Sequence, residues 1–293
     1  MSSLPPKQPC SAGRSKPTSL RSRRSGRSKL TSLRSRRAAL LIFVLLGLVM
    51  IYGFCLSPYG VNELTEGGKL QPPSWAHPMG TDHLARDLLT RVGQGAGWSL
   101  LLALGIIAVG ASLGLVIGGP AAYFGGPVDW ALSRLTDTLL AFPGILMALM
   151  LMTVLGRGVA SLVFSLGLAF VPSFARIARA GLQKVRGENY IKRLEIMDAP
   201  AGRIIFVHML PLIRDQYLNA LMLGLANALL AESGLSFLGF GLQPPTPSWG
   251  SILAESHAYI FQAPWYAIFP GFALVLTVFA IYLFGRSWQG EEA

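Results

Sequence analysis

The organisation of this chain is decided by the segment Tyr190–Pro211, which reads YIKRLEIMDAPAGRIIFVHMLP. It is a charged stretch between two hydrophobic spans, and its pattern is helical. Eight basic residues lie in or beside it: Arg176, Arg179, Lys184, Arg186, Lys192, Arg193, Arg203 and Arg214. A cationic loop between membrane helices is where a membrane protein can contact a cytosolic partner. The segment is therefore the best indication of what the protein does.

The composition around this segment is that of a membrane protein. Hydrophobic residues make up 52% of the 293 residues, charged residues 13%, and the mean hydropathy is +0.49. A soluble domain carries about a quarter charged residues. A helix crosses the hydrocarbon core with about 20 apolar residues. We predict an all-α membrane protein with six transmembrane helices, at Ala38–Leu56, Trp98–Pro120, Leu135–Leu155, Val159–Phe174, Leu212–Leu230 and Tyr266–Gly285.

The positive charges predict the orientation of these spans. Residues 1–37 hold 11 of the 25 Lys and Arg residues, and the region from Arg176 to Arg214 holds eight. Basic residues mark the cytoplasmic side of short loops. Six spans after an internal N-terminus place the second basic cluster inside as well, with both termini cytoplasmic. This distribution argues against nucleic acid as the partner, although the net charge is +11.

Residues 1–37 contain no acidic residue and nearly repeat themselves, because SKPTSLRSRR at Ser15–Arg24 returns as SKLTSLRSRR at Ser28–Arg37. Such a tract cannot bury enough apolar surface to fold, so we predict a disordered basic cytoplasmic tail. It binds anionic membrane lipids, only fixes the topology, or results from a start codon upstream of the true one, and the sequence leaves these readings open.

The stretch 58–96 is predicted to be extracytoplasmic. Within it, Gly80–Arg91 reads as a short amphipathic helix, with Thr81 or Asp82 as its N-cap. Asp87 is expected to pair with a neighbouring arginine. A metal site is conceivable, but we favour a capping residue, an ion pair and surface histidines, so no bound metal is predicted; the conceivable ligands are His77, Asp82, His83 and Asp87.

Ionisable residues inside membrane spans are expensive and suggest function. Arg134 and Asp137, one turn apart, are expected to pair. Glu232 is the most deeply placed acidic residue. It either lines a translocation path or accepts hydrogen bonds from Ser233 or Ser236 in a structural role.

Two further patterns concern packing. Gly110, Gly114 and Gly118 form a small-residue face that lets another helix approach closely. Pro143, Pro172 and Pro270 are expected to kink later spans.

The sequence contains no phosphate-binding loop, no H-E-x-x-H zinc motif and no nucleophile elbow. The chain is therefore not expected to be an enzyme. If it moves a solute uphill, another chain supplies the energy.

Three segments resemble the inner-membrane permease subunits of ABC importers for dipeptides, oligopeptides or nickel. HPMGTDHLARD at His77–Asp87 is similar to that family's external motif, with Ala85 where glycine is usual. The others are Ala231–Gly250, close to the signature E-A-G-L-S-F-L-G-L-G-x-x-P-P-x-P-x-W-G, and Val116–Pro143. The resemblance runs from about residue 38 to 285. It implies a type I ABC importer permease fold, with the permease transmembrane domain over 97–286.

The cytoplasmic loop 180–211 resembles the EAA loop of these permeases, which docks a short coupling helix into a groove of the ATPase. Asp198 stands at the position of the family glycine, and with Pro200 it would break the helix, Asp198 capping the next one. An apolar stripe of Ile191, Leu194 and Met197 would insert into the partner. The resemblance implies that the coupling residues are Tyr190, Ile191, Lys192, Arg193, Leu194, Glu195, Met197 and Asp198.

The resemblance also implies the partners: a second homologous permease, two ATP-binding subunits and an extracytoplasmic solute-binding protein. ATP and Mg²⁺ would bind to the ATPases, and this chain would bind no cofactor. The location would be a bacterial or archaeal inner membrane. Residues Gly80–Arg91 and Gln243–Trp265 would form the docking surface and gate, with Asp82, Arg86, Asp87 and Trp249 as candidate residues.

The substrate would be a dipeptide, an oligopeptide, nickel or a metal chelate. The Lys-Arg-Leu sequence at Lys192–Leu194 and the preceding Asn189–Lys192 faintly resemble metal-importing members. One alternative is an ion-coupled secondary transporter, which predicts inverted repeats and intramembrane ion sites. Another is a membrane enzyme, which would need paired carboxylates or metal ligands. The sequence shows none of these features.

Overall fold

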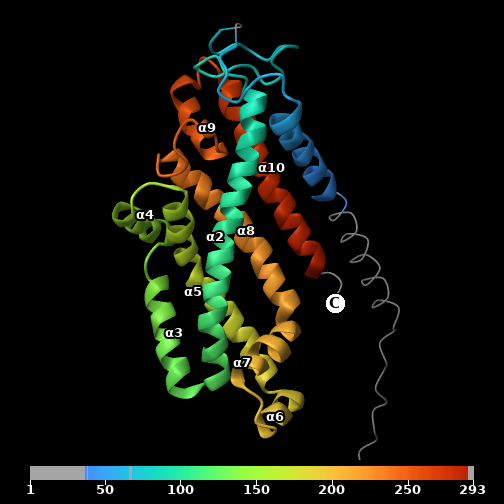
Figure 1. Ribbon diagram of the computed structural model, residues 1–293, viewed down its shortest axis with the longest axis vertical. Coiled ribbons are helices and arrows are strands. Elements are labelled where there is room, and N and C mark those ends of the chain that lie inside the picture. Colours follow the sequence, from blue (N-terminus) through green and yellow to red (C-terminus); the bar gives the residue numbers. More distant parts are fainter. Residues whose placement is uncertain (1–36, 38, 66–67, 290–293) are drawn as a thin grey trace, which may run out of the picture.

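The computed structural model describes residues 37, 39–65 and 68–289 of the chain. The predicted tail at 1–37 lies, apart from Arg37, outside the described residues. The described part of the chain begins with the first span at Ala39–Leu56 and is mostly helical apart from the segment 57–87 and the connection 238–248 (Figure 1). The elements in order are η1 (Tyr52–Leu56), α2 (Leu88–Phe124), α3 (Gly126–Leu140), α4 (Gly144–Leu155), α5 (Val159–Arg186), α6 (Asn189–Ile196), α7 (Ala201–Arg203), η2 (Ile204–Met209), η3 (Leu210–Ile213), α8 (Arg214–Phe237), α9 (Trp249–Ser256), η4 (His257–Tyr259) and α10 (Pro264–Gln289).

The prediction of an all-α membrane protein is confirmed. The described part of the chain contains five helices long and apolar enough to cross a membrane, and six spans if the bent pair α3–α4 counts as one. The long helices lie side by side along the longest axis (Figure 1). The non-helical segment 57–87 and α9 lie at one end of the bundle, called here the α9 end. The short helices α6 and α7 lie at the opposite end, called the α6 end.

Close packing of α2 against α5 forms the centre of the bundle, as the small-residue face predicts. A Cβ atom at Gly114 would lie 2.5 Å from the Cβ of Phe174. One at Gly118 would lie 2.4 Å from the carbonyl oxygen of Ala175. Only glycine fits at these positions, so the spacing of four residues sets the distance between the two helices.

The third predicted span, Leu135–Leu155, is wrong as a single helix. The chain forms α3 and α4 instead, and their axes differ by 88°. Pro143 lies at the break, where it supplies no backbone N–H and disfavours the helical conformation at Phe142. In contrast, Pro172 and Pro270 lie inside α5 and α10, which continue past them.

The predicted pair of Arg134 with Asp137 is also wrong. The Asp137 carboxylate instead accepts a hydrogen bond from Nη2 of Arg176 on α5, at 2.9 Å. A second pair, Arg179 with Asp129, joins the same two helices. Both ion pairs connect α3 to α5, so they tie the bent segment to the bundle.

Candidate functional site

The external motif forms a tight loop instead of the predicted helix over Gly80–Arg91. The Asp82 carboxylate accepts hydrogen bonds from the backbone N–H groups of Leu84 (2.8 Å) and Arg86 (2.9 Å). Ala85 has a positive φ of 68°, in the left-handed region. A helix cannot continue through that conformation, so the prediction fails for a local reason. The family glycine at this position would adopt it without strain.

The helix begins at Leu88, with Asp87 as its N-cap. The Asp87 carboxylate accepts hydrogen bonds from the backbone N–H and the hydroxyl of Thr90, at 2.9 and 2.7 Å. Its other oxygen lies 2.9 Å from Nδ1 of His77. The expected pairing of Asp87 with an arginine is therefore wrong, and His77 is buried instead of lying on the surface.

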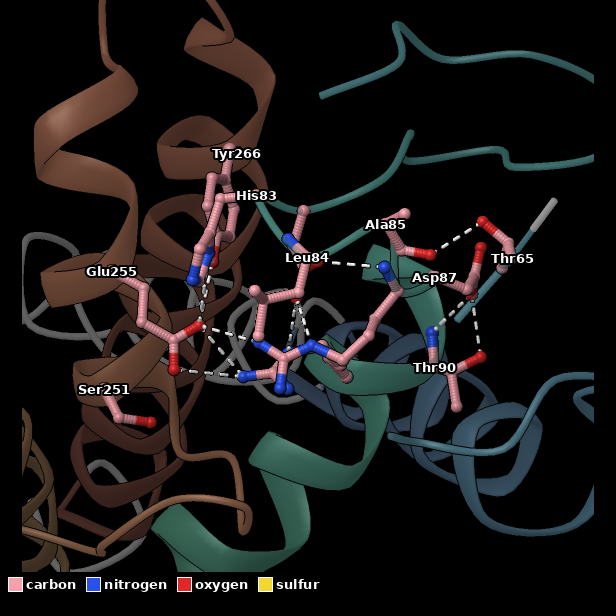
Figure 2. Close-up of polar contacts among 12 residues, drawn as sticks. Thr65, His83, Leu84, Ala85, Asp87, Thr90, Ser251, Glu255 and Tyr266 are labelled. Atoms are coloured by element: carbon pink, nitrogen blue, oxygen red, sulfur yellow. Dashed lines mark hydrogen bonds and ion pairs between the residues drawn. The ribbon is translucent and has the colours of Figure 1, made fainter. Parts of the chain in front are cut away.

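A cluster of charged side chains joins this loop to three helices at the α9 end (Figure 2). Glu255 of α9 accepts hydrogen bonds from Arg91 of α2 (3.0 Å) and from the hydroxyl of Tyr266 of α10 (2.8 Å). It also accepts one from Arg86, whose Nε donates to Asp82 at 2.6 Å. We call this the external ion-pair cluster; its members are Asp82, His83, Arg86, Arg91, Glu255 and Tyr266.

The ligand atoms of Asp82, His83 and Glu255 lie within 4.8 Å of one another. The two carboxylates, however, already bind the guanidinium groups of Arg86 and Arg91. A metal ion would have to compete with two positive charges that are held in place, so the geometry favours an ion-pair cluster. The four conceivable ligands also separate, because His77 and Asp87 form a pair of their own.

The four side chains proposed from the sequence for docking or gating are buried. Asp82, Arg86, Asp87 and Trp249 all lie below the surface of this chain. They position the loop and α9, and they do not present side chains to a partner in this structure. The large apolar side chains that are exposed at the same end belong to other residues, including Leu64, Trp75, Ile260 and Phe261.

Trp249, near the end of the signature Ala231–Gly250, attaches α9 to α2 by two hydrogen bonds. Its indole N–H donates to the carbonyl oxygen of Val92 at 3.1 Å, and its backbone N–H donates to Ser99 at 3.1 Å. A Cβ at Gly250 would lie 2.4 Å from the carbonyl oxygen of Ser233. These contacts pack α9 tightly between α2 and α8.

Glu232 lies in the same packed region. Its carboxylate accepts hydrogen bonds from the hydroxyls of Ser236 (2.6 Å) and Ser233 (3.3 Å), and the side chain is fully buried. Of the two sequence-based interpretations, the hydrogen-bonded one describes its surroundings. The side chain lines neither the groove between α5 and α8 nor the apolar pocket between α2 and α8.

At the α6 end, the predicted apolar stripe does not face outward as a unit. Ile191 is 0% exposed and packs with the chain's own residues, including Leu182, Ile204 and Met209. Leu194 packs against the same group. The exposed apolar residues are Ile196 (84%) and Met197 (76%), with Tyr190 half exposed. Insertion of Ile191 into a partner is therefore wrong, because that side chain anchors α6 to its own protein.

Asp198 ends α6 by a different mechanism from the one predicted. Its φ is +58°, and the backbone N–H groups of Asp198 and Ala199 donate to the carbonyl oxygens of Glu195 (3.1 Å) and Leu194 (3.2 Å). These bonds form a Schellman motif, in which a left-handed residue closes the helix. Asp198 does not cap the next helix, because the residue before α7 is Pro200 and no side chain caps it.

The other residues for which the resemblance implies a coupling role surround this turn. The Tyr190 hydroxyl lies 2.6 Å from Nδ1 of His208, which holds α6 against η2. Glu195 pairs with Arg186 at 3.7 Å. Lys192 and Arg193 are exposed. The face of α6 that is open to a partner is thus cationic around an apolar pair, Ile196 and Met197.

Sequence reasoning missed a groove of about 270 Å³ between α5 and α8, which has polar side chains among its apolar lining. Four polar side chains line it: Ser173 of α5 and Gln216, Asn219 and Asn227 of α8. The available signal was the spacing of Gln216, Asn219 and Asn227, which puts these three polar residues on one helix face. The polar interruption of the fifth span was visible in the sequence, but its face was not.

Comparison with known proteins places these features in a family. Residues 110–290 match the family described as "Binding-protein-dependent transport system inner membrane component". A dipeptide transport system permease protein of Alkalihalophilus pseudofirmus is 35% identical over 242 residues, covering 81% of this chain and 78% of that protein.

Two further relatives are also named as permease proteins of transport systems. A putative peptide transport system permease protein of Brucella suis is 38% identical, covering 83% of each chain. A glutathione transport system permease protein of Pectobacterium atrosepticum is 34% identical, covering 85% of this chain and 83% of that protein. The chain therefore belongs to the family of binding-protein-dependent transport system inner membrane components, the permeases of ABC importers.

Proposed function

We propose that this chain forms one half of the membrane path of an ATP-driven importer of short peptides. The importer contains a second permease, two separate ATP-binding subunits and an extracytoplasmic solute-binding protein. The observation that carries the proposal is family membership together with relatives named for dipeptide, peptide and glutathione transport. We propose peptides in place of nickel, because the three relatives reported above are named for dipeptide, peptide and glutathione transport, whereas the likeness of Asn189–Lys192 to metal-importing members is faint.

The ATPase binds this chain through α6. This helix lies at the α6 end of the bundle, and its buried anchor, Ile191, fixes it to α5 and η2. Ile196 and Met197 then project from its C-terminal turn as the apolar contact. Exposed Lys192 and Arg193 set the orientation on an acidic rim. Movement of the ATPases is passed to α5 and α8 because both adjoin the anchored loop.

The solute-binding protein docks at the α9 end. Trp75 and Phe261 are fully exposed there, and exposed aromatic residues are enriched in protein interfaces. The external ion-pair cluster, in which only His83 and Glu255 are partly exposed, holds the segment 57–87 to α9 and α10. Asp82 and Arg86 therefore contribute by holding the surface in shape.

The experiment replaces Ile196 and Met197 with lysine in the complex expressed with its partner subunits. We expect the ATP-binding subunits to be lost on purification of the permease pair, because two charges cannot be buried in an apolar groove without a partner. Peptide uptake is lost with them. Persistence of both ATPase co-purification and uptake would show that α6 is not the docking element.

Ile260→Lys is the matched control. Ile260 is also an exposed branched apolar residue, but it lies next to η4 at the opposite end of the bundle. We expect this variant to retain the ATPases. Loss of the ATPases in the control as well would mean that added charge disrupts assembly in general.

A further inference from the structure

The groove between α5 and α8 contains polar groups that this chain does not satisfy. The side chains of Ser173, Gln216, Asn219 and Asn227 form no hydrogen bond with any described residue. All four lie in helices long and apolar enough to cross a membrane, and Asn219 and Asn227 lie farther along these helices from the charged residues Arg176 and Arg214 than Ser173 and Gln216 do. An amide group without a partner in a lipid environment costs several kcal/mol, roughly 2–7. Water, a solute or another subunit must therefore meet this face, because lipid cannot do so cheaply.

The chemistry of the groove is neutral. Its described lining consists of Phe170, Ser173, Phe174, Ile177, Gln216, Asn219, Ala220, Leu223, Gly224 and Asn227. None of these carries a charge, an imidazole or a sulfur atom. A path for nickel ions would need such ligands. Side-chain amides, in contrast, both donate and accept hydrogen bonds, which matches the N–H and C=O groups of a peptide backbone.

The spacing of the amides also suits a peptide in transit. Gln216 and Asn227 are eleven residues apart on α8, which corresponds to about 16 Å along the helix axis. An extended dipeptide spans only about 7 Å. One substrate can therefore contact one or two amides at a time and move to the next. Weak, repeated sites of this kind allow a solute to enter and leave without being trapped.

We propose that Gln216, Asn219 and Asn227, with Ser173, form the substrate-contacting wall of the translocation path and select neutral peptide amides over metal ions. This assignment rests on the proposed function. It replaces Glu232 as the path residue, because Glu232 is buried on another face of α8 and bonded to Ser233 and Ser236.

The test measures dipeptide uptake by vesicles that contain the complete importer and its binding protein. Asn227→Leu and Asn219→Leu are each expected to lower uptake about tenfold, the value of one lost hydrogen bond to a desolvated partner. ATP hydrolysis stimulated by the binding protein and co-purification of all subunits should persist. Asn227→Ser, which keeps a polar group, should restore most of the uptake.

Two exposed serines give a matched pair. Ser173 lines the groove between α5 and α8, whereas Ser112 of α2 lines an apolar pocket between α2 and α8. Ser173→Leu should reduce uptake and Ser112→Leu should not. Normal uptake by all the leucine variants would overturn the assignment. Loss of the second permease from Asn227→Leu complexes would overturn it too, because the groove would then be a subunit contact.

If the proposed function itself is wrong, the uptake measured for the wild-type importer shows it. In that case the wild-type importer takes up no dipeptide, or takes up nickel in its place, before any variant is compared.

Discussion

Asp198 adopts a backbone conformation that favours glycine, and its surroundings explain why a non-glycine residue can remain there. The Schellman bonds from Asp198 and Ala199 satisfy two carbonyl oxygens at the end of α6. Ala199 and Leu194 both pack against the cluster of buried residues that includes Ile191. The turn is thus held by packing on both sides of Asp198, and a residue that tolerates the left-handed region is sufficient.

Asp198→Gly should stabilise this turn by about 1 kcal/mol, because glycine adopts a positive φ without steric cost. Because of this stabilisation, we expect the backbone amide hydrogens of α6 to exchange about fivefold more slowly than in the wild-type protein, measured in detergent. Asp198→Ala serves as the control, since it removes the same carboxylate but keeps the cost of the left-handed conformation. Equal exchange rates in the two variants would contradict this account of the turn.

Single residues show where sequence reasoning reaches its limit. The hydrogen bonds of Glu232 to its neighbouring serines could be predicted, because the partners lie within one helical turn. The pairing of Asp137 with Arg176 could not, because the partners come from different helices. The burial of Ile191 depends on how α6 is rotated against η2, and the spacing of apolar residues alone does not fix that rotation.

At the scale of elements, the apolar runs located the long helices because membrane spans need about 20 apolar residues. The ends of these helices were less predictable. Helix α5 continues to Arg186 through a polar stretch, and α2 begins at Leu88. The predicted boundary of the extracytoplasmic segment, at residue 96, therefore falls inside α2. The bend before α4 depends on Pro143, whose effect differs from that of Pro172.

The external ion-pair cluster joins the segment 57–87 to α2, α9 and α10. Glu255→Ala would leave the guanidinium groups of Arg86 and Arg91 with only the carboxylate of Asp82 between them, and Arg91 is fully buried. We expect the free energy of unfolding to fall by about 3 kcal/mol, since an uncompensated buried charge remains. Denaturant titration in detergent measures this loss.

Glu195→Ala provides the comparison for that measurement. Its pair with Arg186 is 3.7 Å long and partly exposed, so its loss should cost less than about 1 kcal/mol. Similar losses in the two variants would mean that the cluster contributes no more than a surface ion pair.

For the whole molecule, the two ends of the bundle differ in chemistry. The α6 end presents a cationic face around two exposed apolar residues, Ile196 and Met197. The α9 end presents Trp75 and Phe261 and contains the external ion-pair cluster. The groove between α5 and α8 lies between these two ends of the bundle. This order, from binding-protein surface through path to ATPase contact, is the arrangement that the proposed importer needs.

The most direct test of this arrangement asks on which side of the membrane α6 lies. Cys10 and Cys55 are replaced by serine, and single cysteines are introduced as Met197→Cys and Leu64→Cys, both at exposed positions. A membrane-impermeant maleimide is then applied to right-side-out vesicles and to inside-out vesicles stripped of peripheral proteins. We predict that Leu64→Cys reacts only in the right-side-out vesicles and Met197→Cys only in the inside-out ones. Labelling of Met197→Cys from the outer face would contradict the account.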